Sequence, residues 1–266
     1  MVSTNSATDK MTLEIKSSKF HYTRQGSGKA LVLLHGFLES QTMWEPFIPE
    51  LIKNHTVITI DLPGHGKSEC IGYIHTMELM AEVVHAVLVH EKIEHASFLG
   101  HSMGGYVALA FAERHPQMCS EMILLNSTPK ADSAERKENR DRAIALVKKQ
   151  KDTFLKMAIS NLFAEKNREK FAAEIEALKK DALKMKTQGI IAALEGMKIR
   201  KDRTRLLKKL TIPKTIIAGT QDPIMPLEDL VKVAKSCDCQ LIKWEGGHMS
   251  TLENKAEMLN FVHFIE

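Results

Sequence analysis

The first residue whose type and setting could do chemistry is Ser102, in the run Gly-His-Ser-Met-Gly-Gly at 100–105. An apolar segment at 96–99 precedes this run, and a helix-like segment beginning near Tyr106 follows it. A strand that turns into a helix at one residue gives that residue a strained backbone and an exposed side chain. The pentapeptide alone also fits an ordinary turn, but its place between a strand and a helix favours an exposed nucleophile.

Two further residues complete a possible catalytic set, and both lie C-terminal to Ser102. Asp222 follows the apolar run at 214–219, so it stands in the loop where a strand ends. His248 follows the apolar run at 240–244 through a pair of glycines, which gives its loop the freedom to fold back over the sheet edge. The order Ser, Asp, His is the one that a nucleophile at a strand-to-helix turn predicts.

Other interpretations of these positions remain open. Asp222 also fits an Asx turn or a helix N-cap before Pro223, and His248 also fits an ordinary surface loop. The alternative place for the acid, after the apolar run that ends at Leu125, holds Asn126 and Ser127 instead of a carboxylate. Asp222 is therefore the expected acid.

These three residue types together indicate nucleophilic catalysis. A serine hydroxyl is a weak nucleophile near pH 7, so it needs a base, and an imidazole with an ordinary pKa of about 6.5 suits that task. A carboxylate on the other ring nitrogen fixes the tautomer and compensates the charge of the imidazolium. His248 is the expected base and Asp222 the expected acid.

The elements that must position these residues follow an alternating pattern. Strand-like runs separated by helix-like runs predict a mostly parallel, doubly wound sheet, and they lie at 30–34, 56–60, 96–99, 122–125, 215–218 and 241–244. Active sites in such sheets form at the carboxyl ends of the strands. Short alternations such as that at 13–15 predict leading strands, and the spacing at 250–265 predicts a terminal helix.

The alternation stops between 128 and 210, where the sequence becomes helical and rich in charge. We expect residues 1–127 and 211–266 to form one core and residues 128–210 to form an inserted helical cap. The insertion holds 23 Lys or Arg against 12 Asp or Glu, although the whole chain is only +4. A basic cap could attract anionic substrates. Reversal of the charge at Lys148, Lys149 and Lys151 would test this. Lysine-rich helical faces are, however, usually only solubilising.

Composition limits the remaining possibilities. A chain of 266 residues with 44% hydrophobic residues suffices for one large domain plus an insertion. No stretch approaches the roughly 18 apolar residues of a membrane span, and no secretory segment precedes the four cysteines, so we expect reduced thiols and a cytoplasmic protein. Metal-ligand spacings, nucleotide-binding fingerprints and basic patches with interleaved aromatics do not occur. We expect no metal, no cofactor and no nucleic-acid partner, and the oligomeric state stays open.

The chain resembles the α/β-hydrolase superfamily, and within it the serine hydrolases with a helical cap, from about Ala30 to the C-terminus. Besides the motif at 100–105, the resemblance rests on Leu-Leu-His-Gly-Phe at 33–37 and Asp-Leu-Pro-Gly-His-Gly-Lys-Ser at 61–68. It implies the α/β-hydrolase fold, a mostly parallel doubly wound sheet of about eight strands with an inserted helical cap. It also implies a catalytic triad of Ser102, Asp222 and His248.

The resemblance further assigns roles around this triad. The backbone N–H groups of Phe37 and Met103 would form the oxyanion hole. The residues expected to line the acyl or alcohol pocket are Phe37, Leu38 and Met103. The residues expected to support the backbone are His35, Gly36 and His101. Neither His35, His65 nor His101 is expected to be the base.

Three functions fit this machinery. The leading one is hydrolysis of a small-molecule carboxylic ester, or a related acyl bond, through an acyl-serine intermediate. The second uses the same triad for carbon–carbon cleavage or for a proton-abstracting elimination, as in a capped superfamily member of menaquinone biosynthesis. The third is a ligand receptor with little turnover. Dehalogenase and epoxide hydrolase chemistry is disfavoured, because those relatives place an aspartate where this chain has Ser102.

Overall fold

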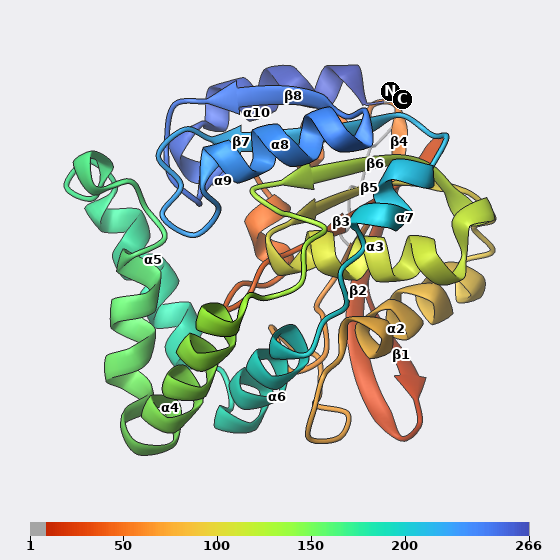
Figure 1. Ribbon diagram of the computed structural model, residues 1–266. Helices are drawn as coiled ribbons and strands as arrows, with labels where there is room; N and C mark the ends of the chain where they lie inside the picture. The colour runs from red at the N-terminus through yellow and green to blue at the C-terminus, as the bar shows by residue number, and fades with distance from the viewer. Residues whose placement is uncertain (1–8, 266) are drawn as a thin grey trace, which may run out of the picture.

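A twisted sheet forms the centre of the computed structural model, which describes residues 9–265 (Figure 1). Within these residues eight strands pair in the order β1-β2-β4-β3-β5-β6-β7-β8. The strands are β1 (Asp9–Ile15), β2 (Ser18–Gly26), β3 (Lys29–Leu34), β4 (His55–Ile60), β5 (Ala96–His101), β6 (Cys119–Leu125), β7 (Lys214–Gly219) and β8 (Gln240–Trp244). Strands β3 to β8 are parallel, and the leading hairpin of β1 and β2 is antiparallel. The predicted mostly parallel sheet and its leading strands are confirmed.

Helices cover both faces of this sheet, because the central strands are apolar on both sides. In β3, Val32 and Leu34 enter one core and Leu31 and Leu33 enter the other. The first core is covered by α2 (Met77–His90), α3 (Met103–Arg114) and α8 (Leu227–Cys237). The second is covered by η1 (Gln41–Trp44), α1 (Ile48–Leu51), α10 (Lys255–Phe261) and η4 (Val262–Phe264). This two-sided cover is the doubly wound arrangement that the sequence pattern predicts.

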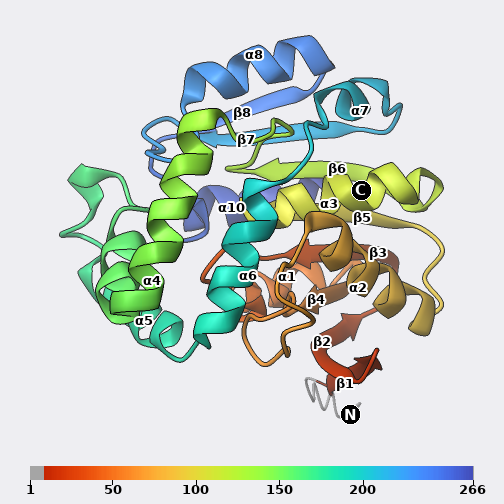
Figure 2. The ribbon, with the colours of Figure 1, turned by 60° about the horizontal axis from the view of Figure 1, so that its bottom comes forward.

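The segment between β6 and β7 is helical. Its elements are α4 (Ala134–Ser160), η3 (Glu165–Asn167), α5 (Ala172–Leu183), α6 (Thr187–Lys198) and α7 (Thr204–Lys209). Helices α4, α5 and α6 pack together to one side of the sheet (Figures 1 and 2). The short α7 instead packs against α3 and α8, which cover one face of the sheet. Helix α4 is kinked at Gln150, whose φ of −147° and ψ of 61° lie outside the helical region.

Two expectations about helices are wrong in detail. Helix α3 begins at Met103, not near Tyr106, because the chain enters the helix directly after the turn at Ser102. The predicted terminal helix at 250–265 is broken into α9 (Ser250–Glu253), α10 and η4. The break falls at Asn254, which has φ of −126° and whose amide donates to the Glu245 carbonyl at 3.1 Å. Among the described residues, no helix has the length and apolar character needed to cross a membrane.

Candidate active site

Ser102 occupies a sharp turn between β5 and α3. Its φ of 49° and ψ of −113° are unusual for a residue with a side chain, and such strain is common at functional sites. The turn is held from behind, because its N–H donates to the Leu125 carbonyl at 2.9 Å and the Ser127 hydroxyl donates to its carbonyl at 2.7 Å. A Cβ at Gly104 would lie 2.2 Å from the Leu34 carbonyl oxygen, so only glycine lets α3 approach β3 this closely. The predicted strand–turn–helix setting of Ser102 is present.

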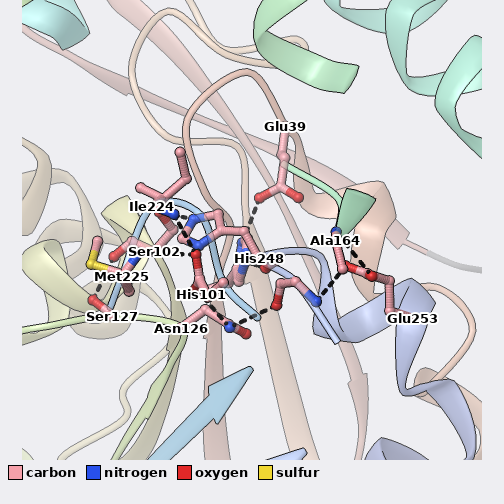
Figure 3. Close-up of polar contacts among 12 residues, drawn as sticks. Glu39, His101, Ser102, Asn126, Ser127, Ala164, Ile224, Met225, His248 and Glu253 are labelled. Carbon is pink, nitrogen blue, oxygen red and sulfur yellow. Dashed lines mark hydrogen bonds and ion pairs between the residues drawn. The ribbon is translucent and has the colours of Figure 1, made fainter. Parts of the chain in front are cut away.

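The structure brings Ser102, His248 and Asp222 together in one hydrogen-bonded chain, of which Figure 3 labels Ser102 and His248. His248 Nε2 lies 2.8 Å from Ser102 Oγ, and His248 Nδ1 lies 2.7 Å from Asp222 Oδ2. Because a carboxylate only accepts, Nδ1 carries the proton, and Nε2 presents its lone pair to the serine hydroxyl. His248 and Asp222 are buried, whereas Ser102 is partly exposed. The arrangement can deprotonate a serine hydroxyl that substrate can reach.

The Asp222 carboxylate is held by four donors. Oδ1 accepts the N–H groups of Ile224 at 2.7 Å and Met225 at 2.9 Å. Oδ2 accepts from His248 and, at 3.0 Å, from the side-chain amide of Asn126. Burial alone would raise the pKa of Asp222, but His248 and the two backbone N–H groups outweigh it and lower that pKa below its ordinary value. Asp222 is therefore ionised at neutral pH.

Asn126 is a site residue that the sequence did not reveal. It follows β6 in the left-handed region with a φ of 47°, and its amide donates to both Asp222 and the Gly247 carbonyl, the latter at 3.2 Å. In the sequence this position counted only as a missing carboxylate. The role of Asn126 can be recognised once β6 and β7 are known to be neighbours, because their ends then place Asn126 beside the loop of Asp222.

His35 and His65 are both buried, and within the described residues neither ring is hydrogen-bonded to Ser102 Oγ. His35 Nε2 accepts the Leu62 N–H at 2.9 Å, so its Nδ1 donates to the Gly36 carbonyl at 2.8 Å. Burial lowers the pKa of His35, in agreement with this neutral form, and lowers that of His65 further. His65 packs its ring against His35 at 5.1 Å between centroids. His35 thereby links the loop after β3 to the loop after β4.

The residues assigned to the oxyanion hole and pocket lie at the start of α3 and in the loop after β3. Met103 is the first residue of α3 and is buried. Phe37 and Leu38 lie in the loop after β3, where Leu38 has a φ of 65° and is buried, and Phe37 is partly exposed. Gly36 stands before them, and its N–H donates to the Glu39 carboxylate at 2.7 Å. Glu39 was not recognised in the sequence, although it follows the motif at 33–37 by only two residues.

The His101 side chain contacts both Glu39 and the backbone of His248. Its Nδ1 lies 2.7 Å from Glu39 Oε2, and its Nε2 lies 2.9 Å from the backbone carbonyl of His248 (Figure 3).

A second overlooked carboxylate, Glu253, accepts the N–H groups of Gly247 at 3.0 Å and Ala164 at 3.2 Å. The segment of the insertion near Ala164 is thereby fastened to the loop that carries His248.

An open cleft of about 550 Å³ lies beside the loop of Asp222. Its lining residues are Phe163, Ala164, Glu165, Lys166, Arg168, Gln221 and Pro223. Lys166 is paired with Glu245, whereas Arg168 Nε is buried without a hydrogen-bond partner. Of the lysines that the sequence nominated for steering anions, Lys151 donates to the carbonyls of Leu183 and Met185, both at 3.1 Å, so it fastens the end of α5.

Metal-ligating groups do not gather anywhere in residues 9–265. No cluster of three or more His, Cys, Asp or Glu side chains there could hold an ion. The cysteines at 70, 119, 237 and 239 are free thiols, and burial raises the pKa of Cys119 to about 12 and that of Cys239 to about 11. The thiols of Cys119 and Cys239 are therefore poor nucleophiles at neutral pH.

Comparison with known proteins adds the family context. A family model described as alpha/beta hydrolase fold matches residues 29–255. The (E)-2-((N-methylformamido)methylene)succinate hydrolase of Acinetobacter baylyi is 26% identical over 252 residues, covering 94% of this chain and 91% of that protein. A malate-bound thermophilic esterase from Thermogutta terrifontis is 30% identical, with a TM-score of 0.88 over 96% of each chain. The enol-lactonase of Burkholderia xenovorans LB400 shares the fold, with a TM-score of 0.87 at 21% identity over 96% of this chain and 98% of that one.

Proposed function

This chain belongs to the α/β hydrolase fold family, and on that premise we propose that it hydrolyses a carboxylic ester of a small molecule through an acyl-serine intermediate. The observation that carries the proposal is the chain of short contacts from Asp222 through His248 to the hydroxyl of Ser102. An esterase with 30% identity over nearly the whole chain supports the same class of bond.

The proposed reaction begins when Ser102 Oγ attacks the ester carbonyl and His248 Nε2 takes the hydroxyl proton. The charge that develops on the carbonyl oxygen is stabilised by the backbone N–H groups of Phe37 and Met103. Collapse of the tetrahedral intermediate breaks the ester bond, and His248 returns the proton to the leaving alcohol. Asp222 stabilises the imidazolium at each stage, and it stays ionised throughout.

The second half of the reaction repeats these steps with water. His248 removes a proton from a water molecule, the resulting hydroxide attacks the acyl-serine, and the same two N–H groups stabilise the second oxyanion. Collapse releases the carboxylic acid and gives the proton back to Ser102. Every proton that leaves a reacting oxygen passes through His248, so no further acid or base is required.

The direct test is hydrolysis of p-nitrophenyl esters from acetate to decanoate by the wild type and by Ser102→Ala. Removal of one triad member is expected to lower kcat by roughly 10⁴-fold or more. A chain-length optimum that vanishes in the variant supports the ester hydrolase and measures its pocket. A folded wild type that turns over none of these esters would overturn the proposal in favour of carbon–carbon cleavage, elimination or a receptor.

We also propose that the substrate carries a carboxylate, because Arg168 lines the cleft beside Asp222 with a buried Nε that has no hydrogen-bond partner. The relatives add support, since one acts on a succinate derivative and another was solved with malate bound. A guanidinium recognises carboxylates through paired N–H donors.

This second proposal is tested with p-nitrophenyl monosuccinate against p-nitrophenyl butyrate, which differ chiefly in charge. Arg168→Gln is expected to raise KM for the succinate about tenfold and to leave KM for the butyrate unchanged. Lys148→Gln is the matched control, because Lys148 is an exposed cation of the same insertion. Equal effects of Arg168→Gln on both esters would contradict a carboxylate contact.

A further inference from the structure

A buried pair of ionisable side chains, His101 and Glu39, lies directly behind the proposed reacting groups. Their side chains are only 1% and 2% exposed, and they are 2.7 Å apart. His101 precedes Ser102 in the chain, and Glu39 belongs to the loop that also carries Phe37. Neither side chain takes part in the proton transfers of the proposed ester mechanism. The pair therefore needs a separate explanation, because burying two ionisable groups is costly.

The contacts of the His101 ring define its protonation. Nε2 faces the backbone carbonyl of His248 at 2.9 Å, and Nδ1 faces Glu39 Oε2 at 2.7 Å. A carbonyl oxygen can only accept, so Nε2 carries a proton. Glu39 Oε2 also accepts the Gly36 N–H at 2.7 Å. An ionised Glu39 satisfies both of these contacts when Nδ1 carries a proton as well, which makes His101 an imidazolium opposite a carboxylate.

The charged groups around His101 agree with this assignment. Burial alone would lower the pKa of His101, but Glu39, the His248 carbonyl and the more distant Asp222 outweigh burial and raise it above its ordinary value. His35 is neutral and the His248 ring lies 5.1 Å away between centroids. Burial alone would raise the pKa of Glu39, and the proximity of His101 reverses that effect and lowers it.

The same pair joins two loops that must keep a fixed separation. Through Glu39 Oε2 it holds the N–H of Gly36, next to Phe37, and through His101 Nε2 it holds the carbonyl of His248. The fit leaves no slack, because a Cβ at Gly36 would lie 2.3 Å from Glu39 Oε2 and 2.7 Å from His101 Nδ1. A shift of either charged side chain therefore moves the proposed oxyanion loop, the base, or both.

We propose that the buried His101–Glu39 ion pair is a positioning device that sets the oxyanion loop and the base His248 at their working separation. This inference rests on the proposed acyl-serine chemistry, in which both loops act on one reacting carbonyl. An ion pair suits the role, because both ends of a charged contact are directional and strongly held in a dry interior. A displacement of about 1 Å at such a site lowers a rate by roughly 100-fold.

The first arm of the test measures protonation directly and needs no substrate. Long-range proton–nitrogen NMR of the 15N-labelled wild type at pH 7 is expected to show both ring nitrogens of His101 carrying protons. The signal is assigned by its loss in His101→Gln. A ring nitrogen without a proton at pH 7 would overturn the ion pair.

The second arm measures catalysis in Glu39→Gln, which keeps the shape of the side chain and removes its charge. The expected result is a kcat lower by about 10- to 100-fold with KM changed less than about threefold. The double variant Glu39→Gln/His101→Gln is expected to lose no more than the worse single variant, because the two residues act as one unit. Additive losses would show two independent packing roles and would overturn the proposal.

His55→Gln is the matched control, because His55 is also a buried histidine with its ring on a backbone carbonyl, that of Leu51 at 3.2 Å. It is expected to keep kcat within about twofold. The rate of Ser102 sulfonylation by phenylmethylsulfonyl fluoride replaces kcat if no ester is turned over, so failure of the ester proposal is recognised separately. If Glu39→Gln does not fold, the double variant, which strands no charge, and the NMR arm decide the question.

Discussion

Replacement of Asp222 by asparagine exchanges one carboxylate oxygen for an NH2 group, and the hydrogen bonds of this site determine what must follow. The N–H groups of Ile224 and Met225 both point at Oδ1, so the new side chain must keep its oxygen there. Its NH2 group then occupies the place of Oδ2, where it faces the NH2 of Asn126 and Nδ1 of His248. To accept that amide proton, His248 must move its own proton to Nε2, the nitrogen that faces Ser102.

The expected loss follows from this tautomer. A base whose Nε2 is already protonated cannot take the serine proton, and a carboxylate-to-amide change at this kind of position lowers kcat by about 10⁴-fold. That factor corresponds to about 5.5 kcal/mol in the activation barrier. KM should change little, because Asp222 is buried behind His248. The two opposed NH2 groups should also lower the free energy of unfolding by about 1–3 kcal/mol, since a buried donor is left without an acceptor.

The double variant Asp222→Asn/Asn126→Asp separates these two effects. The carboxylate introduced at position 126 would accept the NH2 of the amide introduced at position 222, but it would have no proton to donate to the Gly247 carbonyl, so the stability should recover only in part. His248 would keep the wrong tautomer, and the activity would stay low. The assay combines kcat for a p-nitrophenyl ester with urea unfolding of the wild type and of both variants. A loss in kcat of less than about tenfold in Asp222→Asn, or recovery of activity in the double variant, would contradict the tautomer change expected for His248.

Three further outcomes follow from the packing and the buried charges. Gly104→Ala should lower the melting temperature by several degrees, because its Cβ would lie 2.2 Å from the Leu34 carbonyl oxygen, whereas Gly72→Ala, with no atom within 4 Å, should show only the smaller effect of its positive φ. Asp132→Ala should cost about 3–5 kcal/mol of unfolding free energy, because it strands the buried Arg200 that lies 2.5 Å away, while Asp141→Ala, which removes an exposed pair with Lys198, should cost under about 1 kcal/mol. Burial would raise the pKa of Asp132, but the neighbouring arginines outweigh burial and lower that pKa. The stabilisation from this carboxylate should therefore be present above about pH 4 and be lost as pH falls through the lower folded pKa. Urea unfolding at a series of pH values detects this dependence, and Asp132→Asn should flatten it.

Local patterns predicted the elements of this protein because they depend on neighbours in the chain. Apolar runs of strand length at 30–34, 96–99 and 215–218 lie within the observed β3, β5 and β7, since a strand buried on both faces needs nothing but apolar side chains. Errors occur where a tertiary contact decides a boundary. The break at Asn254 depends on the Glu245 carbonyl, and the start of α3 depends on the turn at Ser102.

In the candidate site, too, local pattern predicted some residues and tertiary contacts determine the others. The sequence predicted Ser102, Asp222 and His248 as the candidate catalytic set, because each follows a recognisable strand and their order matches one architecture. Their hydrogen-bond partners, in contrast, depend on the folded arrangement of distant segments. Asn126 and Asp222 are 96 residues apart, and Glu39 and His101 are 62 apart, so no local pattern links them.

This difference arises because secondary structure depends on nearby residues, whereas buried hydrogen bonds depend on contacts in space. Periodicity and turn chemistry act within a few residues, so they can be read along the chain. Satisfaction of a buried polar group is a condition on space, and any donor that the fold brings within about 3 Å can meet it. For Glu39 and Asn126 that donor or acceptor arrives from a distant strand end, and it becomes identifiable only when the order β3-β5-β6-β7 sets those ends side by side.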